Sequence, residues 1–267
     1  ENPIISDPDV SHAEAWFREL EFLAVQDLFL TETARYADVI LPGASFAEKE
    51  GTYVNTERRI QLAKKAVNPP GEARGDLDII IELSNRIGLA TNFRNASEVM
   101  NEIARVTPSW RGVSHARLDG GPGLQYPVPD ANHPGTSFLF DDRFPTADGK
   151  AVFHAVEFLP PAELPDDEYP FILNTGRQMY HWHTGTMTRR SFALDAREST
   201  PTVELNPADA LALGVKDGDT IAISSRRGRI MIAARISGRV ARHQVFVPMH
   251  YREAAANLLT NPALDPY

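Results

Sequence analysis

Apolar residues in the first part of the chain gather in short runs that predict buried strands. One run covers residues 20–27 (LEFLAVQD), and another covers residues 37–43 (ADVILPG), which ends in Pro-Gly. The stretch between them, LFLTETARY, is long enough for a short helical crossover. Two strands joined in this way indicate a parallel α/β sheet, and ligands of such sheets bind beyond the carboxyl ends of the strands.

A 3.6-residue period then predicts two helices. In residues 75–89 (GDLDIIIELSNRIGL) the apolar positions follow this period, and Gly88 is a suitable stop. A second helix is expected after Asn95, a residue type suited to the N-cap. Residues 119–165 are rich in Gly, Pro and Asp and predict a long loop, and residues 159–170 (LPPAELPDDEYP) are typical of an interdomain connector.

The last hundred residues change to short strands with few helices. Strands are expected at residues 171–176 (FILNTG) and 243–251 (HQVFVPMHY), and on both sides of a turn at Arg227-Gly228, where apolar and polar positions partly alternate. Several short strands of this kind indicate a closed β-barrel.

Two short helices are expected among these strands. Asn206 is suited to the N-cap of the first, Pro207 to its first turn and Gly214 to its end. Residues 252–259 (REAAANLL) predict the second.

Composition narrows the possible partners. The net charge of −9 argues against a nucleic-acid binder, because contacts with phosphate dominate that affinity. No apolar run approaches the roughly 18 residues of a membrane span, so we expect none in this chain. The chain has no cysteine, which excludes disulfides, thiolate zinc sites, cysteine-ligated iron–sulfur clusters and a cysteine nucleophile within it.

Candidate chemistry is concentrated in residues 175–190, TGRQMYHWHTGTMTRR. His181 and His183 would point the same way on an extended chain, but a zinc site needs a third ligand and no spacing supplies one. A cradle for an anion fits better, because glycine permits close approach and positive φ while arginine forks match phosphate oxygens. A solvated loop whose arginines pair with Asp195 and Glu198 is an equally supported alternative.

The same segment closely resembles the cofactor loop of the molybdopterin oxidoreductases, in the form found in formate dehydrogenase catalytic subunits. This resemblance implies the end of a Rossmann-like α/β domain over residues 1–158, with connecting helices and loops. A double-psi β-barrel dinucleotide-binding domain, truncated at its C-terminus, is expected over residues 159–267. Other blocks similar to the family follow in consistent order at residues 25–61, 135–153, 203–230 and 248–266.

The resemblance implies a bis-molybdopterin guanine dinucleotide cofactor with Mo or W. It assigns Asp76 to the guanine N1–H and amino group, a role that suits two parallel acceptor oxygens; an ordinary helix N-cap is the alternative. It assigns Asn257 to a dinucleotide, with a polar residue near a helix end as the alternative. No residue of this chain is assigned to the metal or to catalysis. A group in the loop is assigned to the pyrophosphate and pterin: Thr175, Gly176, Arg177, Gln178, His181, His183 and Thr184.

For function, the resemblance implies oxidation of formate to CO2, with electrons passed to iron–sulfur clusters. The family's metal-bound cysteine or selenocysteine, an adjacent histidine and a formate-orienting arginine precede the matching region, and the ligands of the 4Fe-4S clusters are missing too. A further lysine- and tyrosine-bearing segment follows it, and Tyr267 stops short of that segment. We therefore expect a cytoplasmic fragment that is inactive alone, completed by the N-terminal part of its subunit and by electron-transfer subunits.

Two alternatives stay open. One is the same region of a periplasmic-type nitrate reductase, which transfers oxygen and has a similar loop. The form MYHWHTG and the block GASFAEKEGTYVNTERRIQ favour formate. The other is a non-catalytic scaffold related to the large iron–sulfur subunit of respiratory complex I, against which the intact polar loop argues.

Smaller expectations concern neighbouring residues. Family matches within residues 47–59 (AEKEGTYVNTERR) predict a hydrogen-bonded loop near the cofactor entrance. Trp182 is expected to be a packing anchor, and Met179 to fill the core. Arg226 and Arg227, in a hairpin turn, are expected to be solvated.

Overall fold

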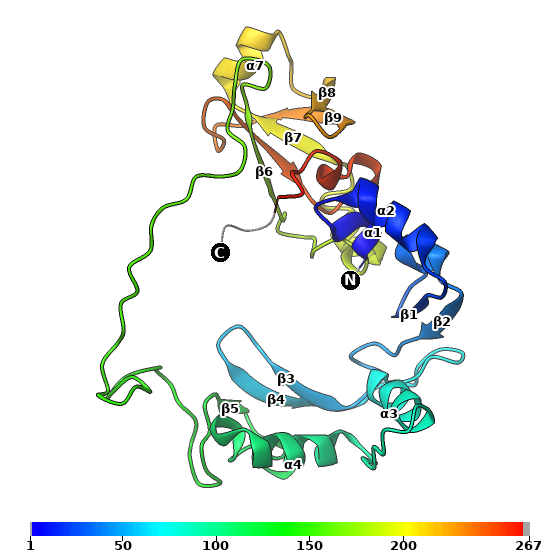
Figure 1. Cartoon of the computed structure of the whole chain (residues 1–267), viewed down its shortest axis with the longest axis vertical. Coiled ribbons are helices and arrows are strands. Elements are labelled where there is room, and N and C mark those ends of the chain that lie inside the picture. Colours follow the sequence, from blue (N-terminus) through cyan, green and yellow to red (C-terminus); the bar gives the residue numbers. More distant parts are fainter. Residues whose placement is uncertain (1, 264–267) are drawn as a thin grey trace. The chain divides into compact units, whose positions relative to one another are not determined.

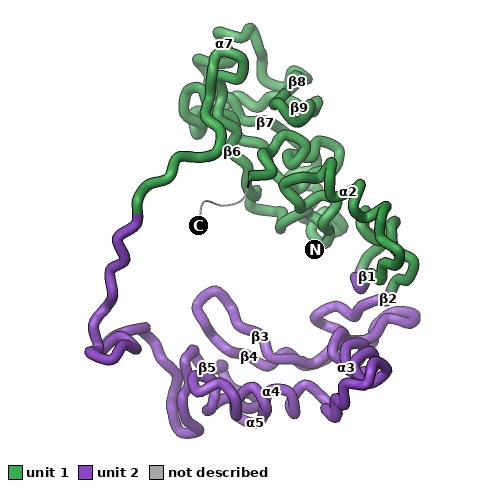
Figure 2. The backbone as a smooth tube through the Cα atoms, viewed as in Figure 1, with its two compact units in different colours: residues 1–25, 29–40, 157–267 green, residues 26–28, 41–156 purple. Residues whose placement is uncertain are grey.

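The computed structural model describes residues 2–263; Tyr267, on which one expectation above rests, lies outside them. The chain forms two compact units (Figure 2). Unit 1 comprises Glu1–Val25, Phe29–Ile40 and Glu157–Tyr267, and unit 2 comprises Gln26–Leu28 and Leu41–Val156. Each unit has its own core of buried apolar side chains. Among the described residues, no helix combines the length and the apolar character needed to cross a membrane.

The two strands predicted near the N-terminus are present and pair in a two-stranded sheet, β1 and β2 (Figure 1). A 3₁₀ helix, η1, connects them and corresponds to the short crossover. The bounds of the elements up to β2 are α1 (Pro3–Ser6), α2 (Val10–Glu19), β1 (Ala24–Asp27), η1 (Thr33–Tyr36) and β2 (Val39–Pro42).

The C-terminal strands form one mixed five-stranded sheet in the order β6-β10-β7-β9-β8. β6 runs parallel to β10 and β7 parallel to β9, while the β10–β7 and β8–β9 pairs are antiparallel. Closure of these strands into a double-psi barrel stays a prediction. The strands are β6 (Ile172–Gly176), β7 (Thr202–Leu205), β8 (Thr220–Ser224), β9 (Arg229–Ile236) and β10 (Gln244–Pro248). The helices among them are η3 (Thr188–Arg190), α6 (Phe192–Asp195), α7 (Pro207–Leu213), η4 (Arg252–Ala254) and η5 (Ala256–Leu258).

Alternation along these strands separates an apolar face from a polar one. Val203 and Val247 are 0% exposed and belong to the core of unit 1. Burying a side chain of this size stabilises the fold by about 1.5–3 kcal/mol. The intervening positions, among them Glu204, Phe246 and Arg235, face the other way because successive side chains of a strand point to opposite sides. Polar groups therefore collect on one side of the sheet.

Local end signals placed several helices correctly. Asn206 caps α7, with its Oδ1 accepting from Ala208 N at 3.0 Å, and Gly214 ends the helix in the left-handed conformation (φ 71°). Asn95 likewise caps α4 by accepting from Glu98 N at 3.1 Å. Replacing such a cap by alanine typically costs about 1 kcal/mol, so these short-range contacts suffice to set a boundary.

Unit 2 contains a three-stranded antiparallel sheet, in the order β3-β4-β5, that packs on helices. The prediction of a loop at residues 47–59 is wrong in part, because β3 and β4 form a hairpin there. Arg58 sits in its turn at φ 65° and donates to the carbonyls of Thr136 (3.1 Å) and Ser137 (2.9 Å). The elements are β3 (Gly51–Val54), β4 (Arg59–Ala63), α3 (Asp76–Arg86), α4 (Ala96–Val106), η2 (Pro108–Trp110), α5 (His115–Leu118) and β5 (Leu124–Gln125).

The single helix predicted over residues 252–259 is wrong. Two 3₁₀ turns, η4 and η5, replace it, and Ala255 between them is extended (φ −62°, ψ 112°). Ala254, Ala255 and Ala256 are all buried. An amphipathic helix cannot bury three consecutive positions on one stripe, so packing favoured the broken form.

Arg226 and Arg227 are exposed, as expected, but both guanidinium groups are also paired. Arg226 pairs with Glu163 and Asp166 of the connector and lies over the ring of Tyr169, 4.5 Å from its centroid. Arg227 pairs with Glu163 too. The turn between β8 and β9 is therefore tied to residues more than fifty positions earlier, which hydrophobic periodicity cannot reveal.

Candidate functional site

The candidate segment, residues 175–190, begins at the end of β6 and continues beyond it. The parallel partner of β6 is β10. Gly176 and Pro248 are register partners, and the Met249 amide donates to the Gly176 carbonyl at 3.0 Å. Parallel pairing places the carboxyl ends of the two strands side by side. The chain after β6 therefore meets the chain after β10, and this junction builds the site.

His250 joins two points of the segment. The amide of Gln178 donates to His250 Nε2 at 2.7 Å, and His250 Nδ1 lies 2.5 Å from the carbonyl of His183. The imidazole is 1% exposed. Burial lowers the pKa of His250, an effect that the hydrogen bond to the His183 carbonyl partly opposes and that nearby His181, Arg177 and Arg189 reinforce.

Tyr251 and His181 form the next layer. The Tyr251 hydroxyl lies 2.9 Å from Gln178 Oε1 and 2.7 Å from the Glu198 carbonyl. His181 Nε2 donates to the same carbonyl at 2.7 Å, and its Nδ1 lies 3.3 Å from Thr188 Oγ1. Burial, helped by the Glu198 charge, raises the pKa of Tyr251 to about 12, so the hydroxyl stays protonated at neutral pH.

The two predicted histidines do different things. His181 is buried against the rings of His250 and Tyr251, whereas His183 adopts φ 45° and meets the edge of Trp182. The chain is therefore not extended at His183, whereas an extended chain was needed for the two histidines to point the same way. Within residues 2–263 no group of three or more His, Asp or Glu side chains lies close enough to hold a metal.

The remaining polar residues of the segment lie nearer the surface. Thr175, at the end of β6, is exposed, and Thr184 Oγ1 lies 2.9 Å from Thr186 Oγ1. Arg177 is exposed and stacks over Trp182, 4.3 Å from the ring centroid. Trp182 is itself 61% exposed and Met179 is 92% exposed, so the expectations of a packing anchor and of core filling are wrong for this structure.

The three arginines of the segment have separate partners. Arg189 makes two 2.8 Å contacts with Glu253, and Arg190 donates to the Thr186 carbonyl at 2.6 Å. In the part of the chain that the structure describes, no carboxylate pairs with Arg177. The alternative of internal ion pairing thus holds for Arg189, which also lies 3.4 Å from Asp195, whereas Glu198 pairs with Arg235 outside the segment. Arg177 remains the arginine best suited to a ligand.

The two glycines matter for different reasons. Gly185 has φ +72°, and a Cβ there would meet Arg189 Cγ at 2.8 Å and the His250 carbonyl at 3.0 Å. Gly176 is an ordinary strand residue, but a Cβ there would meet Phe246 at 2.9 Å. Positive φ, which glycine permits at both positions, is found at Gly185 only; both positions are packed too closely for a side chain.

A cavity of about 650 Å³ lies beside the segment, on the polar face of the sheet. One cross-strand row lines it: Phe246 is opposite Asn174 and Glu204, and Glu204 is opposite Arg235. Residues 177–180 add a wall from the candidate segment. The cavity and the segment are therefore one continuous feature of unit 1.

Charges in this cavity are partly balanced. Arg235 pairs with Glu198 at 3.3 Å, and Arg239 pairs with Glu204, which is 5% exposed. A buried carboxylate needs such a partner. With Arg177 the lining carries three guanidinium groups against two carboxylates, which leaves an excess of positive charge suited to an anion. Sequence reasoning did not single out Arg235, Arg239, His250 or Tyr251; the block that contains the last two was recognised without a role for either.

Asn257 lies in η5, close to the N-terminal helices. Its Nδ2 donates to the carbonyls of Ile5 and Asp7, each at 3.0 Å. The side chain thus anchors α1, and a contact with a dinucleotide stays a prediction.

Asp76 lies in unit 2, in the first turn of α3, where Gly75 and not Asp76 is the N-cap. Its Oδ1 accepts from Gln26 Nε2 at 2.6 Å, and its Oδ2 pairs with Lys49. Partial burial raises the pKa of Asp76, but the contacts with Lys49 and Gln26 outweigh it and hold the pKa below its ordinary value. Gly43, just after β2, approaches the carboxylate closely, since a Cβ there would lie 3.3 Å from Oδ1.

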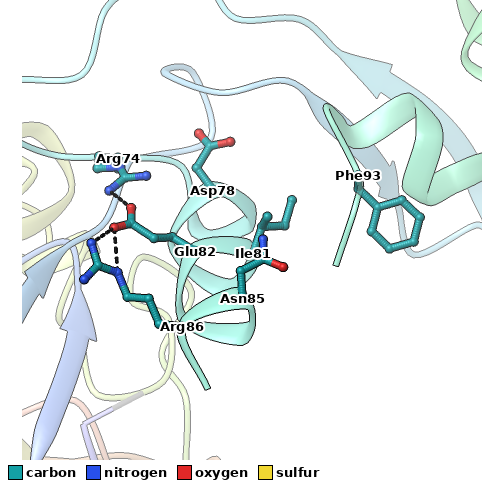
Figure 3. A pocket seen from close by; sticks show the side chains of 7 residues that line it. All are labelled: Arg74, Asp78, Ile81, Glu82, Asn85, Arg86 and Phe93. Atoms are coloured by element: carbon teal, nitrogen blue, oxygen red, sulfur yellow. Dashed lines mark hydrogen bonds and ion pairs between the residues drawn. The ribbon is translucent and has the colours of Figure 1, made fainter. Parts of the chain in front are cut away.

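Figure 3 shows a second cavity, of about 670 Å³, farther along α3. Arg74 and Arg86 converge on Glu82, each with a 2.6 Å contact. These side chains are exposed, and surface pairs of this type contribute about 0–1 kcal/mol. None of the residues assigned to the cofactor lines this cavity.

Comparison with known families decides the class of protein. Residues 1–86 match the family described as molybdopterin oxidoreductase, and residues 171–267 match the molydopterin dinucleotide binding domain. The chain therefore contains a molybdopterin oxidoreductase region and a molydopterin dinucleotide binding region. Asp76 falls in the first matched range and the candidate segment in the second.

Curated proteins similar to this chain include formate dehydrogenases. The chain is 50% identical over 267 residues to the F420-dependent formate dehydrogenase subunit alpha of Methanocaldococcus jannaschii, and 47% identical to subunit alpha of the F420-dependent formate dehydrogenase 1 of Methanococcus maripaludis. Each match covers 99–100% of this chain but 40% of the relative, so the chain spans less than half the length of either relative. An assimilatory nitrate reductase catalytic subunit of Bacillus subtilis is 37% identical over 99% of this chain and 39% of its own.

A solved structure supports the fold. Acetylene hydratase from Pelobacter acetylenicus matches with a TM-score of 0.67 and 20% sequence identity, over 98% of this chain and 39% of that one. At this identity the match concerns the fold alone. The arrangement of mixed sheets and short helices is therefore one that a solved protein also adopts.

Proposed function

We propose that this chain is the C-terminal, cofactor-binding portion of a molybdenum- or tungsten-dependent formate dehydrogenase. The observation that carries the proposal is the segment after β6, whose buried hydrogen bonds to His250 and Tyr251 hold its polar side chains in place. Support for formate comes from three relatives named F420-dependent formate dehydrogenase subunit alpha, which are 43–50% identical to this chain. The relatives named nitrate reductase are 37–39% identical, and two named putative formate dehydrogenase are 35% identical.

The donor set of the segment fits a bis-molybdopterin guanine dinucleotide. Arg177 offers a fork for pyrophosphate, and Thr175, Gln178 and Thr184 offer neutral donors beside it. His181 and His183 support the same segment from within. Asp76 would receive the guanine, because an ionised carboxylate presents two acceptors to the N1–H and amino group. When bound, the cofactor supplies a metal centre that takes two electrons from formate.

The contribution of this chain is positioning. Groups fixed before the cofactor arrives require no reorganisation when it binds, and they hold the reacting centre in one place. We propose that the rest of the subunit provides the metal-bound cysteine or selenocysteine, the histidine, the arginine and the 4Fe-4S ligands, and that further subunits in the cytoplasm carry electrons onward. The proposed architecture remains an α/β domain over residues 1–158 and a double-psi β-barrel over 159–267.

The test is an assay of the full-length subunit. We expect formate-dependent dye reduction, with molybdenum or tungsten and about two guanine nucleotides bound per subunit, as a bis-dinucleotide cofactor requires. The 267-residue chain alone is expected to show none; steady formate oxidation by it would refute the proposed division of labour.

A nitrate reductase is the second candidate, favoured by the relatives that carry that name. Nitrate-dependent oxidation of reduced dye, without activity on formate, would select it. A full-length protein that contains neither metal nor guanine would instead indicate the non-catalytic scaffold.

A further inference from the structure

His250 is the buried point at which two stretches of the candidate segment meet. It follows β10, contacts Gln178 at the start of the segment and contacts His183 five residues later. The segment has irregular backbone between these points, so no ladder of strand or helix hydrogen bonds holds it together. One imidazole therefore links the residues assigned to the cofactor.

Only one protonation state satisfies both contacts. The Gln178 amide is a donor, so His250 Nε2 must carry a lone pair; the His183 carbonyl is an acceptor, so Nδ1 must carry the proton. A second proton on Nε2 would face an N–H at 2.7 Å. Protonation thus replaces a hydrogen bond by repulsion between two donors.

The surroundings disfavour a charged imidazole. The ring of His181 lies 5.4 Å away, and Arg177 and Arg189 are the cations that act on His250, while Tyr251 packs edge-on at 6.1 Å with a neutral hydroxyl. No buried carboxylate compensates among the groups that contact the ring in the described structure.

We propose that His250 is a positioning residue that holds the cofactor segment only while its imidazole is neutral, so that acid releases the segment and with it the cofactor. This inference rests on the proposed function and goes beyond it, because it adds a residue and a pH dependence. The pKa of His250 lies below the ordinary 6.5, so the unfolded or released state binds the proton more tightly. The hold is complete above pH 6.5 and is lost as the pH falls from there through the folded pKa.

The experiment compares three variants of the full-length holoenzyme. His250→Gln keeps one donor and one acceptor but cannot titrate, His250→Phe removes both, and His12→Gln changes an exposed histidine elsewhere in unit 1. Each is held at pH 7.5 and at pH 5, and the guanine and metal retained after gel filtration are measured over time, together with KM and kcat for formate.

For the wild type and His12→Gln, we expect release at least about tenfold faster at pH 5 than at pH 7.5, the factor that one lost buried hydrogen bond corresponds to. His250→Gln should release at a rate independent of pH, within about twofold of the wild type at pH 7.5. His250→Phe should release quickly at both values. A His250→Gln enzyme that keeps the full acid response would overturn the proposal, even if His250→Phe fails to fold.

Hydrogen exchange separates this inference from the proposed function. Exchange of the Gln178 amide is measured without cofactor, in the wild type and in His250→Gln at equal pH. If acid removes the protection of the Gln178 amide in the wild type but not in His250→Gln, the result supports the positioning role of His250, whatever the cofactor proves to be. Equal protection in both at pH 5 contradicts it, and absence of metal and guanine from the full-length protein contradicts only the proposed function.

Discussion

The candidate segment of unit 1, which follows β6, and the Asp76 cluster of unit 2, which joins α3 to β1, are built differently. The segment is held by partners far away in sequence, such as His250 and Tyr251, whose side chains are 0–1% exposed. Asp76 is held by Lys49 and Gln26. The side chain of Asp76 is 43% exposed and that of Lys49 is 29% exposed.

This difference determines how each region can respond to a ligand. Buried hydrogen bonds are costly to break, because the released donor or acceptor finds no water, so the segment keeps one arrangement. A half-exposed ion pair contributes about 0–1 kcal/mol, so Lys49 and Gln26 can exchange Asp76 for another partner at small cost. We infer that the segment is rigid before a ligand binds, whereas the side chains of the Asp76 cluster can rearrange when a ligand binds.

The strongest way to break this comparison is Gly185→Ala. Both Gly185 and Gly214 have φ near 71°, but a Cβ at Gly185 collides with Arg189 and His250, whereas Gly214 has nothing within 4 Å. We expect Gly214→Ala to cost about 1–2 kcal/mol for the left-handed conformation. Gly185→Ala should cost about 1–3 kcal/mol more, from overpacking. Denaturant unfolding of both variants measures the difference, and equal losses would show that the segment is not rigid.

A smaller effect is expected from Tyr251→Phe. The substitution removes the hydroxyl near Gln178 Oε1 and the Glu198 carbonyl and should cost about 1–3 kcal/mol, because buried acceptors lose a donor. The matched control is Tyr36→Phe. The Tyr36 hydroxyl donates to the exposed Glu14, so its removal should lower the free energy of unfolding by less than about 1 kcal/mol. Thermal unfolding of the two variants compares them; identical shifts in Tm would contradict a special role for burial.

The smallest effect on stability is expected from Asp76→Asn. Its pKa is lowered in the folded state, so the ionised carboxylate contributes stability above its ordinary pKa of 3.8 that is lost as the pH falls through the folded value. At neutral pH the loss should stay below about 1 kcal/mol because the pair is partly solvated.

The cofactor should respond to Asp76→Asn far more than the fold does. An amide cannot offer two acceptors to guanine, so we expect guanine affinity to fall about ten- to hundredfold. The control is Asp78→Asn, an exposed carboxylate in the same helical turn. Guanine retained by the full-length variants measures the effect, and equal retention in both would remove Asp76 from the binding site.

Local signals explain which expectations succeeded. α7 and α4 were placed correctly because Asn206, Gly214 and Asn95 act on backbone groups within a few residues. The polar segment could be selected as a candidate from its donors alone. The choice between ligand cradle and solvated loop could not: Arg189 does meet the nearby Asp195, but the sequence could not show that Glu253, more than sixty residues away, also reaches it or that Glu198 pairs with Arg235.

By itself the sequence determined the positions of most strands and capped helices, the absence of thiol chemistry and, through residues 175–190, where polar donors gather. Only the tertiary structure decided that residues 252–259 break into two turns, that Arg226 and Arg227 hold the connector, and that His250 locks the segment. The reason is the range of the forces involved. Caps and periodicity act over a few residues, whereas burial and buried hydrogen bonds depend on which distant parts of the chain become neighbours.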